Sequence, residues 1–115
     1  MIEKKYYDNK EKLIRTVSFR YDAQGRLESE TDVDTDGKPG GNHGERCYIY
    51  PDTSPKTKAS RIDNLSWGKW VSTELYTYDE HGRLSRVDYH RGAPEATGPT
   101  PENNYETIRY VYQTE

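Results

Sequence analysis

A seven-residue pattern that occurs twice places the strongest constraint on the fold of this chain. Tyr21-Asp22-Ala23-Gln24-Gly25-Arg26-Leu27 returns as Tyr78-Asp79-Glu80-His81-Gly82-Arg83-Leu84, with five of the seven residue types kept. In a type I turn, Asp suits the first position because its carboxylate accepts backbone hydrogen bonds. Gly suits the fourth because that residue takes positive φ. Each copy is therefore predicted to be a tight hairpin with a bulge at the glycine.

The residues that flank each turn extend the prediction to the strands. Tyr and Leu can meet across two antiparallel strands, whereas the Arg between Gly and Leu points to the other side, toward water or a neighbouring carboxylate. Two degenerate copies are visible, one at 7–13 without the glycine and one at 50–52 with a proline. The hairpin is thus predicted to be the repeating unit of the chain.

Between the turns, apolar and polar residues alternate with a period of two, and no helical period is long enough to place a helix. We predict an all-β fold, an antiparallel meander of about eight strands in one open, twisted sheet. The chain of 115 residues forms a single β domain, 1–115, with irregular Gly- and Pro-rich loops at 34–44 and 91–104. The expected strands are 2–7, 12–21, 26–33, 45–50, 59–66, 70–78, 83–90 and 105–112.

The composition indicates how such a sheet is stabilised. Only 30% of the residues are apolar, yet 11 residues are Tyr and the net charge is only -3. Disordered chains combine few aromatic residues with high net charge, so this composition favours a folded domain. We expect a thin sheet with many half-buried tyrosine rings in place of a deep core.

Several classes of protein are excluded by simple features. No apolar run is long enough for a membrane span, and the first residues lack the apolar stretch of a signal peptide. A single cysteine, Cys47, cannot form an internal disulfide. These features predict a cytoplasmic protein that does not bind a membrane. A pI of about 5.6 argues against nucleic-acid binding, which needs a positive face.

The pattern Tyr-Asp-x-x-Gly-Arg-Leu, complete at 21–27 and 78–84 and partial at 7–13, resembles the repeat signature of the YD-repeat, or rearrangement-hotspot (Rhs), family. In that family, many repeats form a long sheet that spirals into a hollow shell, often around the toxic C-terminal domain of a bacterial polymorphic toxin. Such toxins are paired with small cytoplasmic immunity proteins. Eight strands are too few to close a shell, so the resemblance implies an open twisted sheet and identifies no catalytic residues.

Metal sites are weakly indicated. Asp32-x-Asp34-x-Asp36-Gly37 imitates the start of a calcium loop, but His43 stands where a bidentate Glu is needed and Pro39 interrupts the loop. His43 and Cys47 supply at most two of the ligands that zinc requires. We therefore predict no cofactor and interpret the acidic run as a solvated turn.

Catalytic signatures are also lacking. No Ser lies in a Gly-x-Ser-x-Gly elbow, and the sequence marks no Ser, His and Asp set. Cys47, in a predicted strand, is expected to be a half-buried hydrophobe and not a reactive thiolate. The chain is therefore predicted not to be an enzyme.

Two groups of residues are candidates for binding a partner. Glu28, Glu30 and Asp32 alternate along one strand and share a face. They can form a solvated edge strand or a docking surface for a basic partner, and an acid–base pair is the least favoured interpretation. Trp67 and Trp70 flank Gly68-Lys69. The pair can form an aromatic platform for a sugar, an anchor for a protein, or a bulge whose rings cover the thin sheet. The acidic group extends to Asp34 and Asp36.

These features favour a non-enzymatic protein–protein binding module or a self-associating sheet, because exposed aromatic patches mark interfaces. With the YD-repeat resemblance, the specific expectation is an immunity protein that blocks a bacterial toxin domain by occlusion, with acidic residues from 28 to 45 for steering and Trp67 and Trp70 as anchors. The alternative is a carbohydrate-binding or structural fragment related to cell-surface YD-repeat shells.

Overall fold

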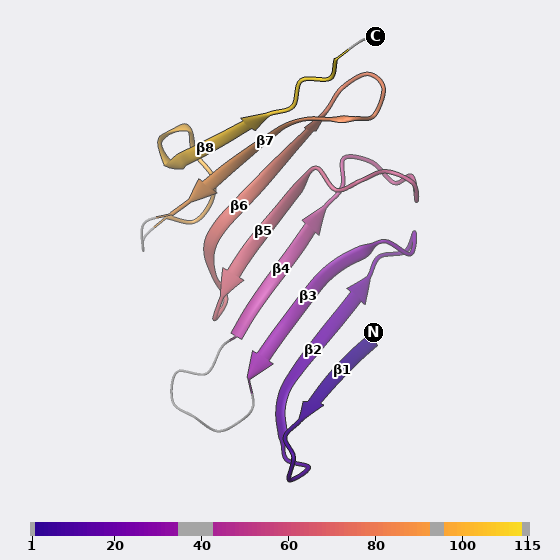
Figure 1. Cartoon of the computed structure of the whole chain (residues 1–115), viewed down its shortest axis with the longest axis vertical. Coiled ribbons are helices and arrows are strands. Elements are labelled where there is room, and N and C mark those ends of the chain that lie inside the picture. Colours follow the sequence, from indigo (N-terminus) through magenta and orange to yellow (C-terminus); the bar gives the residue numbers. More distant parts are fainter. Residues whose placement is uncertain (1, 35–42, 93–95, 114–115) are drawn as a thin grey trace.

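The computed structural model describes residues 2–34, 43–92 and 96–113, and these form one antiparallel sheet of eight strands in sequential order (Figure 1). The predicted all-β meander is confirmed, and every expected strand is present, the first with the expected bounds and the others with shifted ends. The strands are β1 Ile2–Tyr7, β2 Leu13–Tyr21, β3 Leu27–Asp34, β4 His43–Ile49, β5 Arg61–Ser66, β6 Lys69–Tyr78, β7 Leu84–Arg91 and β8 Asn104–Arg109.

Both complete heptads are chain reversals. The amide of Gly25 donates to the carbonyl of Asp22 at 3.0 Å, and Gly82 donates to Asp79 at the same distance. The two glycines have φ of +80° and +77°, the left-handed region in which a Cβ is strained. The strand register shifts beside each turn, as a bulge requires. The predicted turn chemistry is therefore correct.

The degenerate copy at 7–13 keeps the same turn without glycine. Asp8 accepts backbone hydrogen bonds from Lys10 at 2.8 Å and Lys12 at 3.0 Å, and Glu11 takes the place of the glycine with φ of 63°. A residue with a Cβ pays strain in this region. The hydrogen bonds of the Asp carboxylate are therefore kept in a turn that lacks the glycine.

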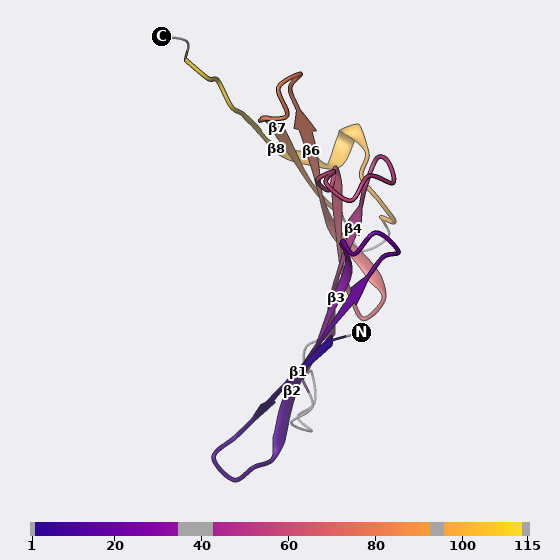
Figure 2. The ribbon, with the colours of Figure 1, turned by 90° about the vertical axis from the view of Figure 1, so that its right-hand side faces the viewer.

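The sheet is a single curved layer (Figure 2). Its Cα radius of gyration is 17.3 Å, whereas a compact domain of this length has about 13 Å. Among the described residues, the buried hydrophobic side chains are Val17, Ile62 and Val87. The strand registers place all three on one side of the sheet. The apolar core is therefore a thin strip on that side.

The two sides of the sheet differ in chemistry. Tyr48, Ile62, Glu74 and Tyr89 lie opposite one another on β4 to β7, and we call their side the tyrosine face. Cys47, Asp63, Thr73 and His90 form the neighbouring row and point to the opposite face. Successive residues of a strand point to opposite sides, so each strand contributes to both faces.

The connection at 91–104 packs against the opposite face. Its described part contains a 3-10 turn, Pro101–Asn103, which the sequence did not predict. Nδ1 of the buried His90 lies 2.9 Å from Oδ1 of Asn103 and 3.0 Å from the carbonyl of Thr100. A Cβ on Gly92 would lie only 2.2 Å from the Trp70 ring, so glycine permits this close approach.

The other predicted loop, 34–44, falls largely outside the described residues. Asp36 lies in that stretch, and so does most of the calcium-like pattern. In the part of the chain that the structure describes, no helix has the length and apolarity needed to cross a membrane.

Candidate protein-docking face

The tyrosine face carries an apolar groove near the turns that join β2 to β3, β4 to β5 and β6 to β7. Its volume is about 460 Å³. The side chains that make it apolar and aromatic are Leu27, Tyr48, Tyr50, Ile62, Tyr76 and Tyr78. Tyrosines form such a groove well because the ring is apolar and the hydroxyl can bond at the rim.

Contacts between successive turns build this groove. The hydroxyl of Tyr50 donates to the carbonyl of Leu27 at 2.7 Å, and its ring centroid lies 4.0 Å from the Arg26 guanidinium. Tyr112 repeats both contacts on Leu84 at 2.7 Å and Arg83 at 4.3 Å. In both cases the tyrosine lies just after the second strand beyond the turn and packs over that turn. We call this arrangement the tyrosine–turn contact.

The middle turn makes a variant of this contact. The hydroxyl of Tyr78 donates to the carbonyl of Ala59 at 3.2 Å, and the Lys58 ammonium lies 5.6 Å from the Tyr78 ring centroid. Burial raises the pKa of Tyr78. The tyrosines along this edge of the sheet therefore stabilise the neighbouring turns.

The heptad Asp fixes the Arg that the tyrosine covers. Oδ1 of Asp22 accepts from the amides of Gln24 and Arg26, and Oδ2 accepts from Arg26 Nε, all at 2.9 Å. Desolvation raises the pKa of Asp22, but these hydrogen bonds outweigh it, so the pKa is lowered. In Asp79, hydrogen bonds from the backbone of Arg83 and His81 and from the Arg83 side chain lower the pKa. Of the two predicted environments of the Arg, water or a neighbouring carboxylate, the structure shows the carboxylate. The prediction that the Arg points away from the Leu is wrong for Arg26, because Arg26 and Leu27 line the same groove.

A second, polar pocket of about 320 Å³ adjoins the groove on the same face. Arg46, Asn64, Ser72, Glu74, Tyr89 and Tyr105 contribute to its lining. The hydroxyl of Tyr76 donates to Oε1 of Glu74 at 3.2 Å, whereas the buried Oε2 has no hydrogen-bond partner. Burial and then the Glu74 charge raise the pKa of Tyr76 to about 12. We call this the Glu74 pocket.

The acidic residues of β3 are placed differently from the expectation. β3 is an internal strand, so the edge-strand interpretation is wrong. Glu30 accepts a hydrogen bond from the Tyr48 hydroxyl at 2.7 Å, and Asp32 binds Arg15, whose Nε lies 2.8 Å from Oδ1. Two of the predicted docking carboxylates are therefore engaged within the sheet.

The other two described members of the acidic group are more exposed. Glu28 is the extra residue of the β2–β3 bulge, because Leu27 and Ser29 pair with consecutive residues of β2. It is exposed, as is Asp34 at the end of β3. Two of the four described acidic residues are thus exposed, at the two ends of the strand.

The two tryptophans occupy different environments. Trp67 lies in the β5–β6 turn with its side chain 62% exposed and its ring edge-on to His43, with centroids 5.1 Å apart. The Trp70 indole donates to the Thr73 hydroxyl at 2.7 Å, which in turn donates to Asp63. Among the described residues, no ring contact joins Trp67 to Trp70. They therefore do not form a shared platform.

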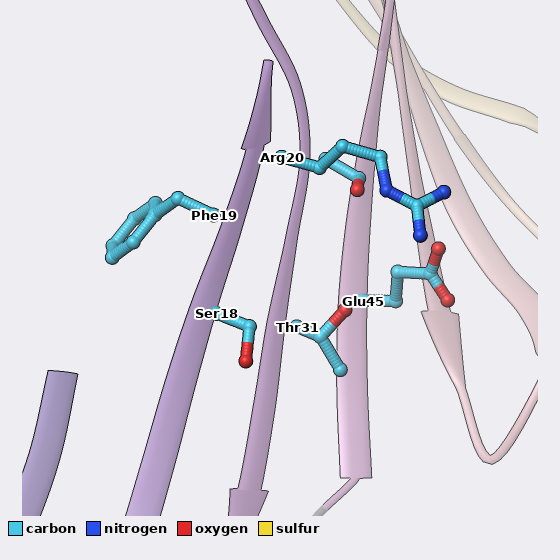
Figure 3. Close-up of a pocket in the computed structure, with 6 residues that line it drawn as sticks. Ser18, Phe19, Arg20, Thr31 and Glu45 are labelled. Atoms are coloured by element: carbon cyan, nitrogen blue, oxygen red, sulfur yellow. The ribbon is translucent and has the colours of Figure 1, made fainter. Parts of the chain in front are cut away.

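On the opposite face, residues of β2, β3 and β4 line a small polar hollow of about 110 Å³. Figure 3 shows Ser18, Arg20, Thr31 and Glu45 around it, with Phe19 pointing away. Pockets for small molecules usually have volumes of about 300–1,000 Å³. This hollow is too small to be the main site.

The environment of Cys47 agrees with the prediction of a half-buried side chain. Cys47 is half-buried, and burial, reinforced by Glu45, raises its pKa to about 11. Its thiol is therefore protonated at neutral pH. The described residues contain no group of three or more His, Cys, Asp or Glu side chains placed to hold a metal ion.

Sequence reasoning missed the Glu74 pocket. The signal was faint: Glu74, Tyr76 and Tyr78 alternate along one strand, which places them on one face. The partners Tyr89 and Tyr105 come from two other strands, and only the registers of β6, β7 and β8 bring them together.

No protein-family model matches this chain, and no curated protein has a matching sequence. The functional conclusion therefore depends on the tyrosine face itself. Its apolar groove and the Glu74 pocket lie side by side, joined by Tyr76, which lines the first and bonds to Glu74 in the second.

Proposed function

We propose that the chain is a non-enzymatic protein-binding module that docks its tyrosine face on a partner protein. The observation that carries this proposal is that the chain exposes more surface than a compact monomer of the same mass. The chain exposes 8411 Å², whereas a compact monomer of 13.4 kDa exposes about 6,500 Å². The excess, about 1,900 Å², is larger than the roughly 600–1,000 Å² that each partner contributes to a standard protein–protein interface.

The chemistry of the face supports the same conclusion. Tyrosine and arginine are enriched in the buried centres of interfaces, and the tyrosine face is built largely from pairs of the two. Arg26 with Tyr50, Arg46 with Tyr48 and Arg83 with Tyr112 are examples. Such residues bury large areas with little loss of side-chain entropy when they are already ordered.

The specific form that we propose is an immunity-type protein that occludes a bacterial toxin domain in the cytoplasm. Support comes from the resemblance of the two heptads to YD repeats and from the small, mildly acidic chain. Steering would come from the net charge of -3, to which the exposed Glu28 and Asp34 contribute at the two ends of β3.

Co-expression tests this proposal. The chain is produced with the C-terminal domain of a YD-repeat protein encoded beside it, and complex formation is measured by gel filtration with light scattering. We expect a stable complex that Tyr105→Ser, on the tyrosine face, weakens. Ile49→Ser changes an exposed apolar residue on the opposite face, with 43% exposure against 53% for Tyr105; it is the matched control and leaves the complex intact. A chain that binds no such domain contradicts the immunity role.

Carbohydrate binding remains the second candidate because one observation favours it, the exposed ring of Trp67. A glycan array separates the two functions. Carbohydrate binding predicts glycan retention that Trp67→Ala abolishes, with Trp70→Ala as the comparison because the Trp70 indole is already bonded to Thr73. The protein-binding proposal predicts no glycan retention.

A further inference from the structure

We propose that the partner of the tyrosine face presents a lysine or arginine side chain to the Glu74 pocket and, two residues away, an apolar side chain to the tyrosine groove. This inference rests on the proposed function and names the chemistry of the segment that is bound. It follows from a carboxylate oxygen that accepts no hydrogen bond, a pair of rings and the spacing of the two cavities.

The carboxylate oxygen lacks a donor. Glu74 Oε2 is buried and accepts no hydrogen bond, and Nη2 of Arg46 lies 3.5 Å away. Arg46 itself is held loosely, with part of its side chain exposed and a 3.3 Å hydrogen bond to the Tyr48 hydroxyl. A carboxylate accepts at both oxygens, so an N–H donor that reaches Glu74 gains a charge-assisted bond. Because the Arg46 ion pair leaves Oε2 without a hydrogen bond, an N–H donor from a partner can supply the bond that is missing.

The rings beside Glu74 suit a cation. Tyr89 and Tyr105 line the same pocket, with ring centroids 6.2 Å apart and planes inclined at 47°. The faces of aromatic rings attract ammonium and guanidinium groups. Tyr105 already has the Arg91 guanidinium 4.9 Å from its centroid. Arg91 therefore already supplies Tyr105 with a cation, and a cation from a partner has the Tyr89 ring beside it.

The charges around the pocket favour a cation over an anion. Glu30 and Glu74 both act on Arg46, and Glu106 lies opposite Tyr89 on β8. With Arg91 beside Tyr105, the pocket region holds three carboxylates and two guanidinium groups, an excess of one negative charge. An acidic segment would meet repulsion here, and a neutral sugar would leave the excess charge unpaired.

The spacing of the two cavities sets the pattern of the segment. Glu74 and Tyr76 are two residues apart on the same face of β6, and Tyr76 lines the apolar groove. Two residues of a strand span about 6.8 Å. A partner segment in extended conformation has the same period, so it can place an apolar residue and a basic residue at positions i and i+2 in the two cavities.

Synthetic peptides test this pattern on the full chain. The probes are capped peptides of Gly and Ser that carry Leu-Thr-Lys or the reversed Lys-Thr-Leu. Binding is followed by NMR shifts of the amides of Glu74, Tyr89 and Tyr105 at about 1 mM peptide, a concentration suited to weak affinity. We expect at least one order to bind, and Leu-Thr-Glu and Glu-Thr-Leu not to bind.

Variants place the interaction. Glu74→Gln keeps the shape of the side chain and should weaken binding about tenfold. Tyr105→Leu should weaken it less, because it removes one ring face. Glu80→Gln, in the exposed β6–β7 turn, is the matched control and should bind like the wild type. Thermal unfolding identifies any variant that fails to fold.

The outcomes separate this inference from the proposed function. If neither Lys peptide shifts the Glu74 pocket, or if the Glu peptides or neutral oligosaccharides bind there equally well, the inference is wrong. If a partner protein binds the tyrosine face but Glu74→Gln leaves its affinity unchanged, the inference fails and the protein-binding function stands. If no protein partner binds, the proposed function fails as well.

Discussion

The two complete heptads share one local geometry and differ in what covers them. In both turns, the Asp carboxylate accepts two amides and the Arg Nε, all at 2.9 Å. Yet the side chain of Arg26 is 10% exposed and that of Arg83 is 48% exposed. The difference arises because Arg26 also donates to the carbonyls of Asp52 and Ser54, at 3.0 and 2.9 Å.

This contrast separates local from tertiary contributions. The heptad alone determines the turn, because both copies reach the same hydrogen bonds in different surroundings. The neighbouring loop determines burial, because the long β4–β5 connection lies over Arg26 whereas Tyr112 is the main cover of Arg83. Substitutions in matched pairs can therefore divide the stability of each turn into two parts.

The largest effect is expected from the turn glycines. Gly25→Val and Gly82→Val should each lower the free energy of unfolding by about 1–3 kcal/mol, since a β-branched residue is strained at positive φ. Nothing lies within 4 Å of a Cβ at either site, so the loss should be nearly equal in both turns. Urea unfolding measures it, and clearly unequal losses would show that the turns are not locally equivalent.

The arginines should differ. Arg26→Ala removes two hydrogen bonds to carbonyls, the contact with Asp22 and the stacking on Tyr50, and should cost about 2 kcal/mol. Arg83→Ala removes an exposed ion pair and one ring contact, and should cost about 1 kcal/mol or less. Equal values from urea unfolding would contradict the role given to the loop.

The tyrosine hydroxyls test the tyrosine–turn contact more finely. Tyr50→Phe deletes the 2.7 Å hydrogen bond to Leu27 and should cost about 1 kcal/mol. Tyr112→Phe deletes the equivalent bond to Leu84 but should cost less, because Tyr112 lies beyond the end of β8 and is more exposed. Thermal unfolding of the two variants and the double variant checks the order; a neutral Tyr50→Phe would argue against the contact.

The smallest effect concerns pH. The pKa values of Asp22 and Asp79 are lowered in the folded chain, so their contribution to stability is present above the unfolded value, about 3.9. It is lost as the pH falls through the folded values. We expect Asp22→Asn and Asp79→Asn each to flatten the fall in urea midpoint between neutral and acidic pH. A variant with an unchanged pH profile would show that its carboxylate does not stabilise the turn.

The fold was largely predictable because its signals are local. Turn chemistry and alternation located every strand, although β4 begins at His43 and not at 45, and β8 ends at Arg109. The short 3-10 turn was missed because it depends on Asn103 meeting His90. Sequence alone carries no sign of that contact.

The candidate site was less predictable because it depends on register. Glu30 and Asp32 were expected at a docking surface, but Tyr48 and Arg15, from the strands on either side, bind them. Trp70 was expected to act together with Trp67 because the two are close in the sequence. Its indole instead donates a hydrogen bond to the Thr73 hydroxyl. Such pairings depend on how strands align across loops, and no local motif encodes them.

The central claim is that the sheet is a single open layer whose tyrosine face is free to bind. Val17 and Val87 test it most directly because both are buried on that face, on β2 and β7. Five strand spacings in a flat sheet separate them by about 24 Å. NMR of the isolated chain should therefore give methyl NOEs from each valine to adjacent strands and none between the two. A direct Val17–Val87 NOE would mean that the sheet folds over on itself and would contradict the account.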